Sequence, residues 1–376
     1  MKVYLDNAAT TPMDPKIIEM TSIMMSSHFG NPSSIHSFGR ESKIIVESAR
    51  KTIAQLLNTS PSSIFFTSGG TEADNMAIMS GIHDHNITHA ITSRLSHHAV
   101  LYPLQDLAKK GVIKISYVDI DENGIVCLNH LKQLLEMNAR TFVSIMHANN
   151  EIGVIQDIKS IGDLCLDYNA IFHSDTVQTI GHYTFNMQKT NVDFMAASAH
   201  KFHGPKGVGF IYISENIKIK PILRGGSQER NMRAGTENIY GIAGLALAMK
   251  ISYSNLEKER KYIEEIKLYM IEKLKSEIAD VQFYGNCTDM KNSLYTVLSC
   301  HFPETDIAEM LLFNLDILGI ACSGGSACAS GGSKGSHVLT EIVPESKRPG
   351  IRFSFSKYTT KEDINFTIKQ LKSLFP

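Results

Sequence analysis

Short apolar runs alternate with helical patterns along the chain up to residue 255. Apolar runs bounded by turn residues are typical of buried strands, and apolar residues three and four positions apart are typical of helices. The strand-like runs lie at 64–67, 89–92, 115–118, 141–146, 170–172, 192–197 and within 204–213. Helical patterns include 15–29, 37–58, 128–136 and 158–168. This alternation predicts an α/β fold with a mostly parallel, doubly wound sheet.

The pattern changes in the last third of the chain. A helix is predicted to begin after Thr236 and to continue towards Lys275 with increasing charge. Beyond it we expect strands near 281–284, 294–299 and 317–321, a helix at 305–315, and a short strand that carries Arg352. We therefore predict a large domain of residues 16–255. Residues 1–15 and 256–376 would form a smaller α+β domain.

The composition gives no sign of nucleic acid or membrane binding. The 376 residues hold 37 Lys and Arg against 38 Asp and Glu, so no excess of basic charge is available for an anionic polymer or surface. No apolar run approaches the roughly 18 residues that a membrane span needs. The first residues, MKVYLDNAATTP, lack the basic and apolar regions of a signal peptide, so we expect a cytoplasmic protein.

The cysteines predict reactive chemistry at one position. None of the six forms a CxxC pair, so we expect no metal site, and free thiols are favoured over disulfides. Cys328 lies in CSGGSACASGGSKGSH at 322–337, whose glycines and serines predict a mobile, accessible loop. A lone cysteine is usually a small buried hydrophobe. An accessible thiol is prone to oxidation, which favours a functional thiol at this position.

Polar side chains follow two neighbouring predicted strands. Asp175 and Gln178 follow one run, and Ser198, His200 and Lys201 follow the next. Ligands bind beyond the carboxyl ends of the strands in open α/β sheets, so these groups are predicted to meet at one edge. A lysine in such a place is the residue type that forms Schiff bases, because desolvation frees the amine.

Two further segments allow either a functional or a structural interpretation. A run of small residues directly precedes a predicted helix start in SGGTEADN at 68–75. Backbone N–H groups at such a helix start could bind a phosphate. A tight strand-to-helix turn without a ligand explains the same residues. Arg352 could bind a carboxylate through two hydrogen bonds, or form a surface salt bridge.

Taken in order, these segments resemble the NifS/IscS-type cysteine desulfurases, which are pyridoxal-phosphate enzymes of the aminotransferase class V group. The resemblance covers nearly the whole chain. Its blocks are YLDNAATTP, GNPSS, FTSGGTEADNMAI, HANNEIGVIQDI, HSDTVQTIGH, SAHKFHGPKGVGFIYI, RGGSQERNMRAGTEN, GSACASG and IRFSFSKYTT. It implies the aminotransferase-like fold, type I of pyridoxal-phosphate enzymes, with a seven-stranded sheet in the large domain.

The resemblance also implies a cofactor site. Lys201 would bind pyridoxal phosphate covalently, and Asp175 would pair with the ring nitrogen. Gln178 and Asn150 would lie near the phenolic oxygen of the ring. His97, in SHHAV, matches the family's EHKAV and would stack on the ring and relay protons.

Other residues would bind the phosphate, the substrate and the sulfur. The residues implied at the phosphate are Gly70, Thr71, Ser198 and His200, with Thr236 contributed by the neighbouring subunit of a homodimer. Arg352, with Asn31 assisting, would hold the substrate carboxylate. Cys328 would be the nucleophile, although the family's usual CTS is CAS in this chain.

The implied reaction converts L-cysteine to L-alanine and leaves the sulfur on Cys328 as a persulfide. Acceptor proteins would then take the sulfur for iron-sulfur cluster assembly or tRNA thiolation. The length of the loop after Cys328 resembles the group that supplies such partners. A selenocysteine lyase or another class V aminotransferase is the nearer alternative, and a transaminase needs no nucleophile at Cys328. A non-catalytic sulfur-trafficking scaffold is more remote, because it would not need Lys201, Asp175 and His97 together.

Overall fold

The computed structural model describes residues 1–324, 336–344 and 346–375. Its large sheet has seven strands in the order β2-β8-β7-β6-β5-β3-β4. The strands are β2 (Ile64–Thr67), β3 (His89–Thr92), β4 (Lys114–Tyr117), β5 (Thr141–Ser144), β6 (Ile171–Asp175), β7 (Phe194–Ser198) and β8 (Gly209–Ile213). β8 pairs antiparallel with β2 and β7, and every other pair of neighbouring strands in this sheet is parallel. The predicted mostly parallel sheet is therefore confirmed.

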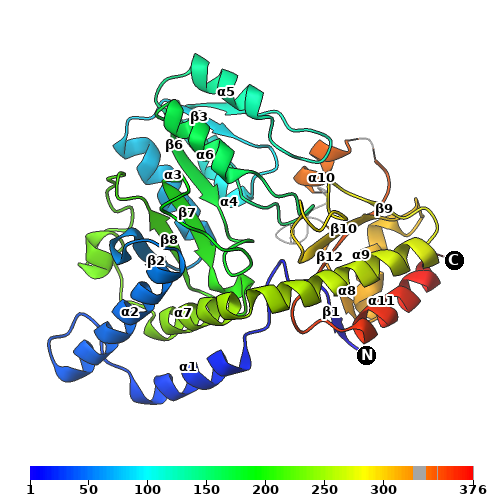
Figure 1. Cartoon of the computed structure of the whole chain (residues 1–376), viewed down its shortest axis with the longest axis horizontal. Helices are drawn as coiled ribbons and strands as arrows, with labels where there is room; N and C mark the ends of the chain where they lie inside the picture. Colours follow the sequence, from blue (N-terminus) through cyan, green and yellow to red (C-terminus); the bar gives the residue numbers. More distant parts are fainter. Residues whose placement is uncertain (325–335, 345, 376) are drawn as a thin grey trace.

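Helices cover both faces of this sheet (Figure 1). On one face α3 (Gly70–Asp84) and α4 (His98–Lys109) pack on alternate strand residues such as Phe65 and Ile211. The other face packs against α2 (Ser37–Leu56), α5 (Leu128–Met137), α6 (Ile158–Asp167) and α7 (Ile239–Ser254). Residues adjacent along a strand point to opposite faces, so nearly continuous apolar strands fit a sheet that is covered on both sides.

A second core surrounds two small sheets. One has the order β12-β10-β9, and the other pairs β1 with β11 in parallel. The strands are β1 (Val3–Tyr4), β9 (Gln282–Phe283), β10 (Val297–His301), β11 (Ile320–Ala321) and β12 (Gly350–Ser354). This core includes side chains of α8 (Leu256–Glu277) and α11 (Lys361–Leu374). The remaining helices are α1 (Pro15–Ser27), α9 (Leu311–Ile317) and α10 (His337–Ile342). The division into domains stays a prediction.

Two predicted helices differ in the structure. The helix expected to run on from Thr236 is interrupted at Asn255, whose side chain donates to the Ile251 carbonyl where α7 ends. The two helices nevertheless run end to end across the molecule (Figure 1). The helix expected at 305–315 begins at Leu311, because the Thr305 hydroxyl accepts the Ile307 N–H and favours a turn. The strands expected at 192–197, 294–299 and 317–321 are shifted or shortened.

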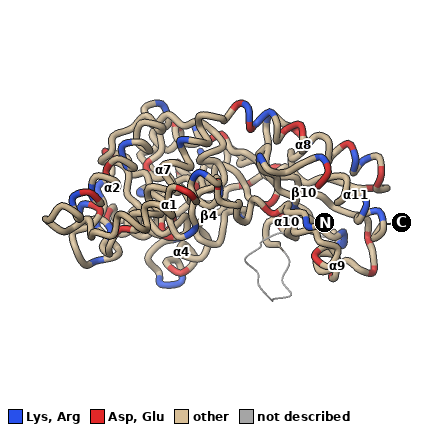
Figure 2. Tube along the Cα trace, turned by 90° about the horizontal axis from the view of Figure 1, so that it is seen from below, with Lys and Arg blue, Asp and Glu red and all other residues tan. Residues whose placement is uncertain are grey.

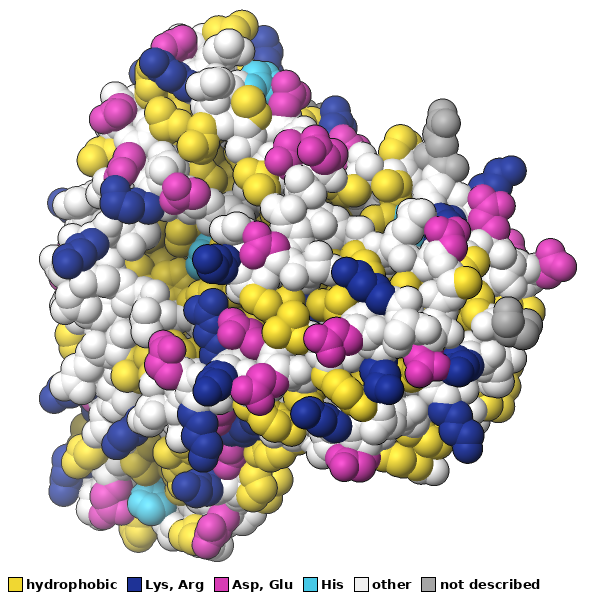
Figure 3. All heavy atoms as spheres, turned by 45° about the vertical axis from the view of Figure 1, so that its right-hand side comes forward, with side chains coloured by type: hydrophobic (Ala, Val, Ile, Leu, Met, Phe, Trp, Pro, Cys, Tyr) yellow, Lys and Arg dark blue, Asp and Glu magenta, His cyan; other side chains and the backbone are white. Residues whose placement is uncertain are grey.

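Charges of both signs are interspersed along the trace and over the face drawn in space-filling form (Figures 2 and 3). That face therefore shows no extended region of one sign. No helix in the described part of the chain is long and apolar enough to cross a membrane.

A buried ion pair joins the segment after β8 to β2. Arg50 on α2 donates to both carboxylate oxygens of Glu229 at 2.8 Å, and Glu229 also accepts the Phe66 N–H at 2.8 Å. Both side chains of the pair are almost fully buried. Glu229 has a φ of 46°, so this contact holds a backbone conformation that is unfavourable for glutamate.

We predict that Glu229→Ala lowers the free energy of unfolding by about 3–5 kcal/mol, because it leaves the Arg50 guanidinium buried without its partner. The matched control is Glu47→Ala, since Glu47 contacts the same guanidinium from a partly exposed position on the same helix. Its expected effect is at most about 1 kcal/mol. Urea denaturation of both variants measures the difference, and equal losses would contradict the importance of the buried contact.

Candidate active site

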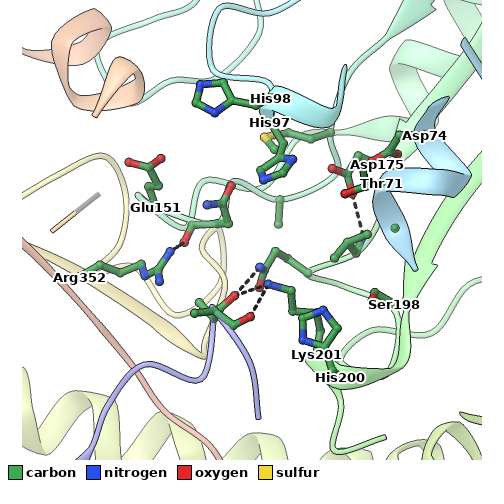
Figure 4. A pocket seen from close by; sticks show the side chains of 18 of the residues that line it. Thr71, Asp74, His97, His98, Glu151, Asp175, Ser198, His200, Lys201 and Arg352 are labelled. Atoms are coloured by element: carbon green, nitrogen blue, oxygen red, sulfur yellow. Dashed lines mark hydrogen bonds between the residues drawn. The ribbon is translucent and has the colours of Figure 1, made fainter. Parts of the chain in front are cut away.

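A cavity of about 330 Å³, here called the main cavity, lies at the carboxyl ends of the large-sheet strands. Figure 4 shows side chains from widely separated segments around it. Its lining residues are Ala8, Ala9, Gly70, Thr71, Asp74, His97, His98, Met146, Ala148, Asn150, Glu151, Asp175, Val177, Gln178, Ser198, His200, Lys201, His337 and Arg352. The predicted convergence of polar groups at one sheet edge is therefore seen in the structure.

One end of the main cavity has the features of an anion site. A second cavity of about 340 Å³, the glycine-turn cavity, shares Gly70, Thr71, Ser198 and His200 with it. These are the four residues that the sequence implied at the phosphate. Helix α3 starts here after Gly69, which makes no side-chain cap. The first N–H groups of a helix lack intrahelical partners and carry its positive dipole end, so a phosphate fits here.

Asp175 ends β6 and is largely buried beside His97. One of its carboxylate oxygens accepts the Val177 N–H at 2.9 Å. Burial raises the pKa of Asp175, and the nearby charges of His97 and Lys201 oppose that rise. A cationic ring nitrogen would be a suitable partner for this carboxylate, because it would compensate the negative charge of Asp175 in a site shielded from water.

His97 is the N-cap of α4, and its Nδ1 accepts the Ala99 N–H at 3.1 Å. In the neutral ring the proton must therefore lie on Nε2. Burial lowers the pKa of His97, and the positive charge of Lys201 lowers it further, while Asp175 acts in the opposite direction. The ring points into the cavity (Figure 4). The backbone thus fixes one tautomer of a cavity-facing imidazole.

Lys201 follows β7 in a single turn of 3-10 helix, Ala199–Lys201. Its Nζ donates to the carbonyls of Ala8 at 2.6 Å and Ala9 at 2.9 Å. The Ala8 carbonyl also accepts the side-chain amide of Gln178 at 3.0 Å. The sequence of the N-terminal segment predicted only a loop. In the structure the backbone carbonyls of this segment position the side chain of Lys201.

Arg352 is almost fully buried on β12, so the surface salt-bridge interpretation is wrong. Its guanidinium donates to Asp6 Oδ1 at 2.7 Å and to the Asn150 carbonyl at 2.9 Å. Its Nε is buried and has no hydrogen-bond partner among the described residues. The hydrogen bonds to Asp6 and Asn150 use two of the five guanidinium N–H donors, so further donors of this cavity-lining side chain remain for a carboxylate ligand.

Sequence reasoning missed two acidic residues near Arg352. Asp6 pairs with it and accepts the Ser323 hydroxyl at 2.8 Å. Glu151 lines the main cavity and accepts a short hydrogen bond from Ser336. Burial raises the pKa of Glu151, although Ser336 and the charge of Arg352 oppose the rise. The partners are hundreds of positions apart, so no local pattern could reveal them.

Two of the described residues predicted for the site, Thr236 and Asn31, do not line the main cavity. Thr236 lines a separate cavity of about 170 Å³ with Arg233 and Glu229. Asn31 lies in an exposed turn before α2, where its side chain accepts the Ser33 N–H. Cys328 and the centre of the predicted mobile loop lie outside the described residues. Among those described, no cluster of His, Cys, Asp or Glu could hold a metal ion.

Comparisons with known proteins identify the family of the chain. A model of the family "Aminotransferase class-V" matches residues 3–366. The chain is 43% identical to "Cysteine desulfurase IscS" of Dictyoglomus turgidum, covering 99% of this chain and 94% of that protein. It is 41% identical to "Putative cysteine desulfurase IscS 1" of Bacillus subtilis, covering 98% and 97% of the two chains.

Solved structures show the same similarity. A structure titled "NIFS-LIKE PROTEIN" superposes with a TM-score of 0.91 at 35% identity and covers 100% of this chain and 99% of that one. "SspA in complex with cysteine" has a TM-score of 0.81 at 27% identity, covering 95% and 100% of the two chains.

The buried histidines predict that stability falls in acid. Burial lowers the pKa of His147, His200 and His203 to about 4. An unfolded histidine has a pKa of about 6.5, so between pH 6.5 and 4 the unfolded chain binds more protons than the folded chain. The free energy of unfolding should therefore decrease as the pH falls through this range.

His203→Asn should weaken this pH dependence. His203 donates through Nδ1 to the Pro12 carbonyl at 2.8 Å and has a φ of 65°, which asparagine tolerates. Thermal unfolding at pH 7.5 and pH 5.0 measures the change, with His83→Gln on the exposed end of α3 as the control. An unchanged difference between the two pH values in His203→Asn would contradict the prediction.

Proposed function

Since the chain belongs to the aminotransferase class-V family and acts as a pyridoxal-phosphate-dependent cysteine desulfurase, we propose that Lys201 binds the cofactor and Cys328 receives the substrate's sulfur. The observation that carries the proposal is the convergence of Lys201, Asp175 and Arg352 on one cavity. An amine, a carboxylate and a guanidinium are the three groups that an amino-acid substrate and a pyridine cofactor require there.

The residues fit pyridoxal phosphate. The start of α3 with Ser198 and His200 would hold its phosphate, and Asp175 would face its ring nitrogen. His97 would stack on the ring, while Gln178 and Asn150 would lie on the side of its phenolic oxygen. When bound, the cofactor supplies an electron sink for the substrate's α-carbon. The main cavity is at the lower end of the size range of small-molecule sites.

Arg352 and Lys201 would act on the substrate in turn. Arg352 would bind the carboxylate of L-cysteine, because its side chain lines the main cavity and its terminal N–H groups are only partly used by Asp6 and Asn150. Lys201 Nζ would take the proton from the α-carbon, and His97 Nε2 would hold a second proton within the cavity. Asn31 as an additional carboxylate ligand stays a prediction.

Cys328 would then take the sulfur as a thiolate. Its Sγ attacks the substrate sulfur, a sulfur–sulfur bond forms and the carbon–sulfur bond of the substrate breaks. The electron pair of the broken bond stays with the substrate carbon, which gains a proton. The balance is L-cysteine plus the Cys328 thiol giving L-alanine plus a Cys328 persulfide. An acceptor protein of iron-sulfur cluster assembly or tRNA thiolation would receive this sulfur in the cytoplasm.

We further propose a homodimer in which Thr236 serves the neighbouring subunit. Large apolar side chains are exposed on α1, on the following turn and on α2, and Ile35 is 90% exposed. The other members of this apolar face are Ile18, Met25, Phe29, Phe38 and Ile44. The Gln228 side chain contacts Ser33 at 3.4 Å, so the segment that carries Thr236 borders the apolar face. A second copy docked there would cover this surface and receive Thr236.

Replacing the nucleophile should separate cofactor binding from turnover. Cys328→Ala should keep the visible absorbance of the bound cofactor but lower alanine and sulfide formation from L-cysteine and a thiol reductant to background. The wild-type protein should form the two products in equal amounts over many turnovers. Cys127→Ala, at an exposed cysteine that caps α5, should behave as wild type. Continued sulfide release by Cys328→Ala would refute the assignment of Cys328.

A mixed dimer tests the position of Thr236. We expect Thr236→Asp to weaken phosphate binding by repulsion, and Lys201→Ala to lose the covalent cofactor linkage. A dimer with one chain of each variant would contain one intact site, which joins Lys201 of one chain with Thr236 of the other. Co-purified mixed dimers should therefore recover activity that neither variant has alone. Absence of recovery in isolated mixed dimers would contradict the exchange of Thr236 between subunits.

A further inference from the structure

A line of buried polar side chains lies behind Asp175. Asp74 on α3, His173 on β6 and Ser144 on β5 are at most 1% exposed. They lie beside apolar core residues such as Phe142, whose ring stacks at 6.1 Å from that of His173. Burying polar groups is costly unless they pair with one another, so this line requires an explanation.

The backbone sets the order of the line. Side chains alternate along a strand, so His173 and Asp175 share the face of β6 on which α3 packs. Asp74 Oδ1 lies 3.2 Å from His173 Nε2, and His173 Nδ1 lies 2.9 Å from the hydroxyl of Ser144 on the paired strand. Asp74 also lines the main cavity beside Asp175 (Figure 4). Four residues thus connect the sheet interior with the predicted position of the cofactor ring.

The two carboxyl groups have unequal surroundings. Burial raises the pKa of Asp175, but the Val177 N–H, which its carboxylate accepts, and the charges of His97 and Lys201 oppose that rise. Asp74 Oδ1 is buried with no hydrogen-bond partner of good geometry among the described residues, and His173 is its only ion-pair contact there. Burial and the charge of Asp175 raise the pKa of Asp74 well above its usual range, and burial lowers that of His173 to about 3. A neutral His173 therefore offers Asp74 no positive charge.

We propose that Asp74 is a positioning residue that carries the one proton of this carboxyl pair and donates it in a hydrogen bond to Asp175, which stays ionised and oriented against the ring nitrogen of pyridoxal phosphate. Two neighbouring buried carboxyl groups do not both ionise. With Ser144 donating to Nδ1, His173 carries its proton on Nε2, next to Asp74 Oδ1. The Asp74 proton is then left on Oδ2. This inference rests on the role proposed above for Asp175.

A cofactor analogue isolates the contact with the ring nitrogen. In 1-deazapyridoxal phosphate a C–H group replaces that nitrogen, so the ratio of its dissociation constant to that of pyridoxal phosphate measures the contribution of the contact. The full-length protein, freed of cofactor, would be titrated with each compound by calorimetry. The variants are Asp74→Asn, Asp74→Ala and Asp175→Ala. The control is Asp193→Asn, a carboxylate outside the main cavity that accepts the Phe172 N–H.

The expected results differ for each variant. Wild type should prefer pyridoxal phosphate, and Asp175→Ala should abolish that preference. Asp74→Asn should keep the wild-type ratio within about twofold, because a neutral amide replaces a neutral acid of the same shape. Asp74→Ala should reduce the ratio by about fivefold, because it removes one hydrogen bond to Asp175. The net contribution of such a bond is about 1 kcal/mol, which corresponds to that factor. Asp193→Asn should leave the ratio unchanged.

Three results would overturn the proposal, and they are distinguishable. If Asp74→Ala weakens both compounds equally, Asp74 has only a structural role. If Asp74→Asn reduces the ratio as much as Asp74→Ala, Asp74 acts through a negative charge and not through a proton. If the wild-type protein itself does not discriminate, the assignment of Asp175 to the ring nitrogen fails, and this inference fails with it.

Discussion

The hydrogen bonds that Lys201 Nζ donates to the Ala8 and Ala9 carbonyls are the contact on which the arrangement of the site depends. They tie the turn after β7 to the N-terminal strap, defined as residues 6–14. The same strap places the Asp6 carboxylate on Arg352, and it donates hydrogen bonds to Ser354 of β12 from the Asn7 side-chain amide and the Ala8 N–H. The strap therefore sets the distance between the two basic groups of the main cavity, although it contributes mainly backbone atoms to it.

Burial determines the protonation of the groups around this contact. The same loss of water that lowers the pKa of His97 raises those of Asp74, Asp175 and Glu151. His97 is kept as a neutral ring with a fixed tautomer, because the Ala99 N–H occupies its Nδ1. Backbone hydrogen bonds and desolvation thus determine where protons lie in the cavity, more than contacts between opposite charges do.

The sequence predicted the site residues that directly follow predicted strands, because the carboxyl ends of parallel strands lie at one edge of the sheet. This rule located Asp175, Ser198 and Lys201 without knowledge of the packing. It could not locate Asp6 or Glu151, whose partners are brought near only by tertiary structure. For Asp74 a signal was present: Ala77 and Ile78, one helical turn away, are core residues, so an aspartate shares an apolar helix face. His173 interrupts an apolar strand in the same way.

Charge balance in the main cavity explains why the anion site lies at the start of α3. Among the described residues, two lysine or arginine side chains line the main cavity, Lys201 and Arg352, and Arg352 is already paired with Asp6. If Asp74 and Glu151 keep their protons, Asp175 is the carboxylate left to balance Lys201. Among the described residues of the main cavity, no lysine or arginine is then left for a phosphate. The start of α3 supplies uncharged donors and the positive end of a helix dipole, and Lys206, which lines the glycine-turn cavity, adds a cation from outside the main cavity. The terminal N–H groups of Arg352 that are not used by Asp6 and Asn150 stay available for the substrate carboxylate, so the two anions do not compete for one cation.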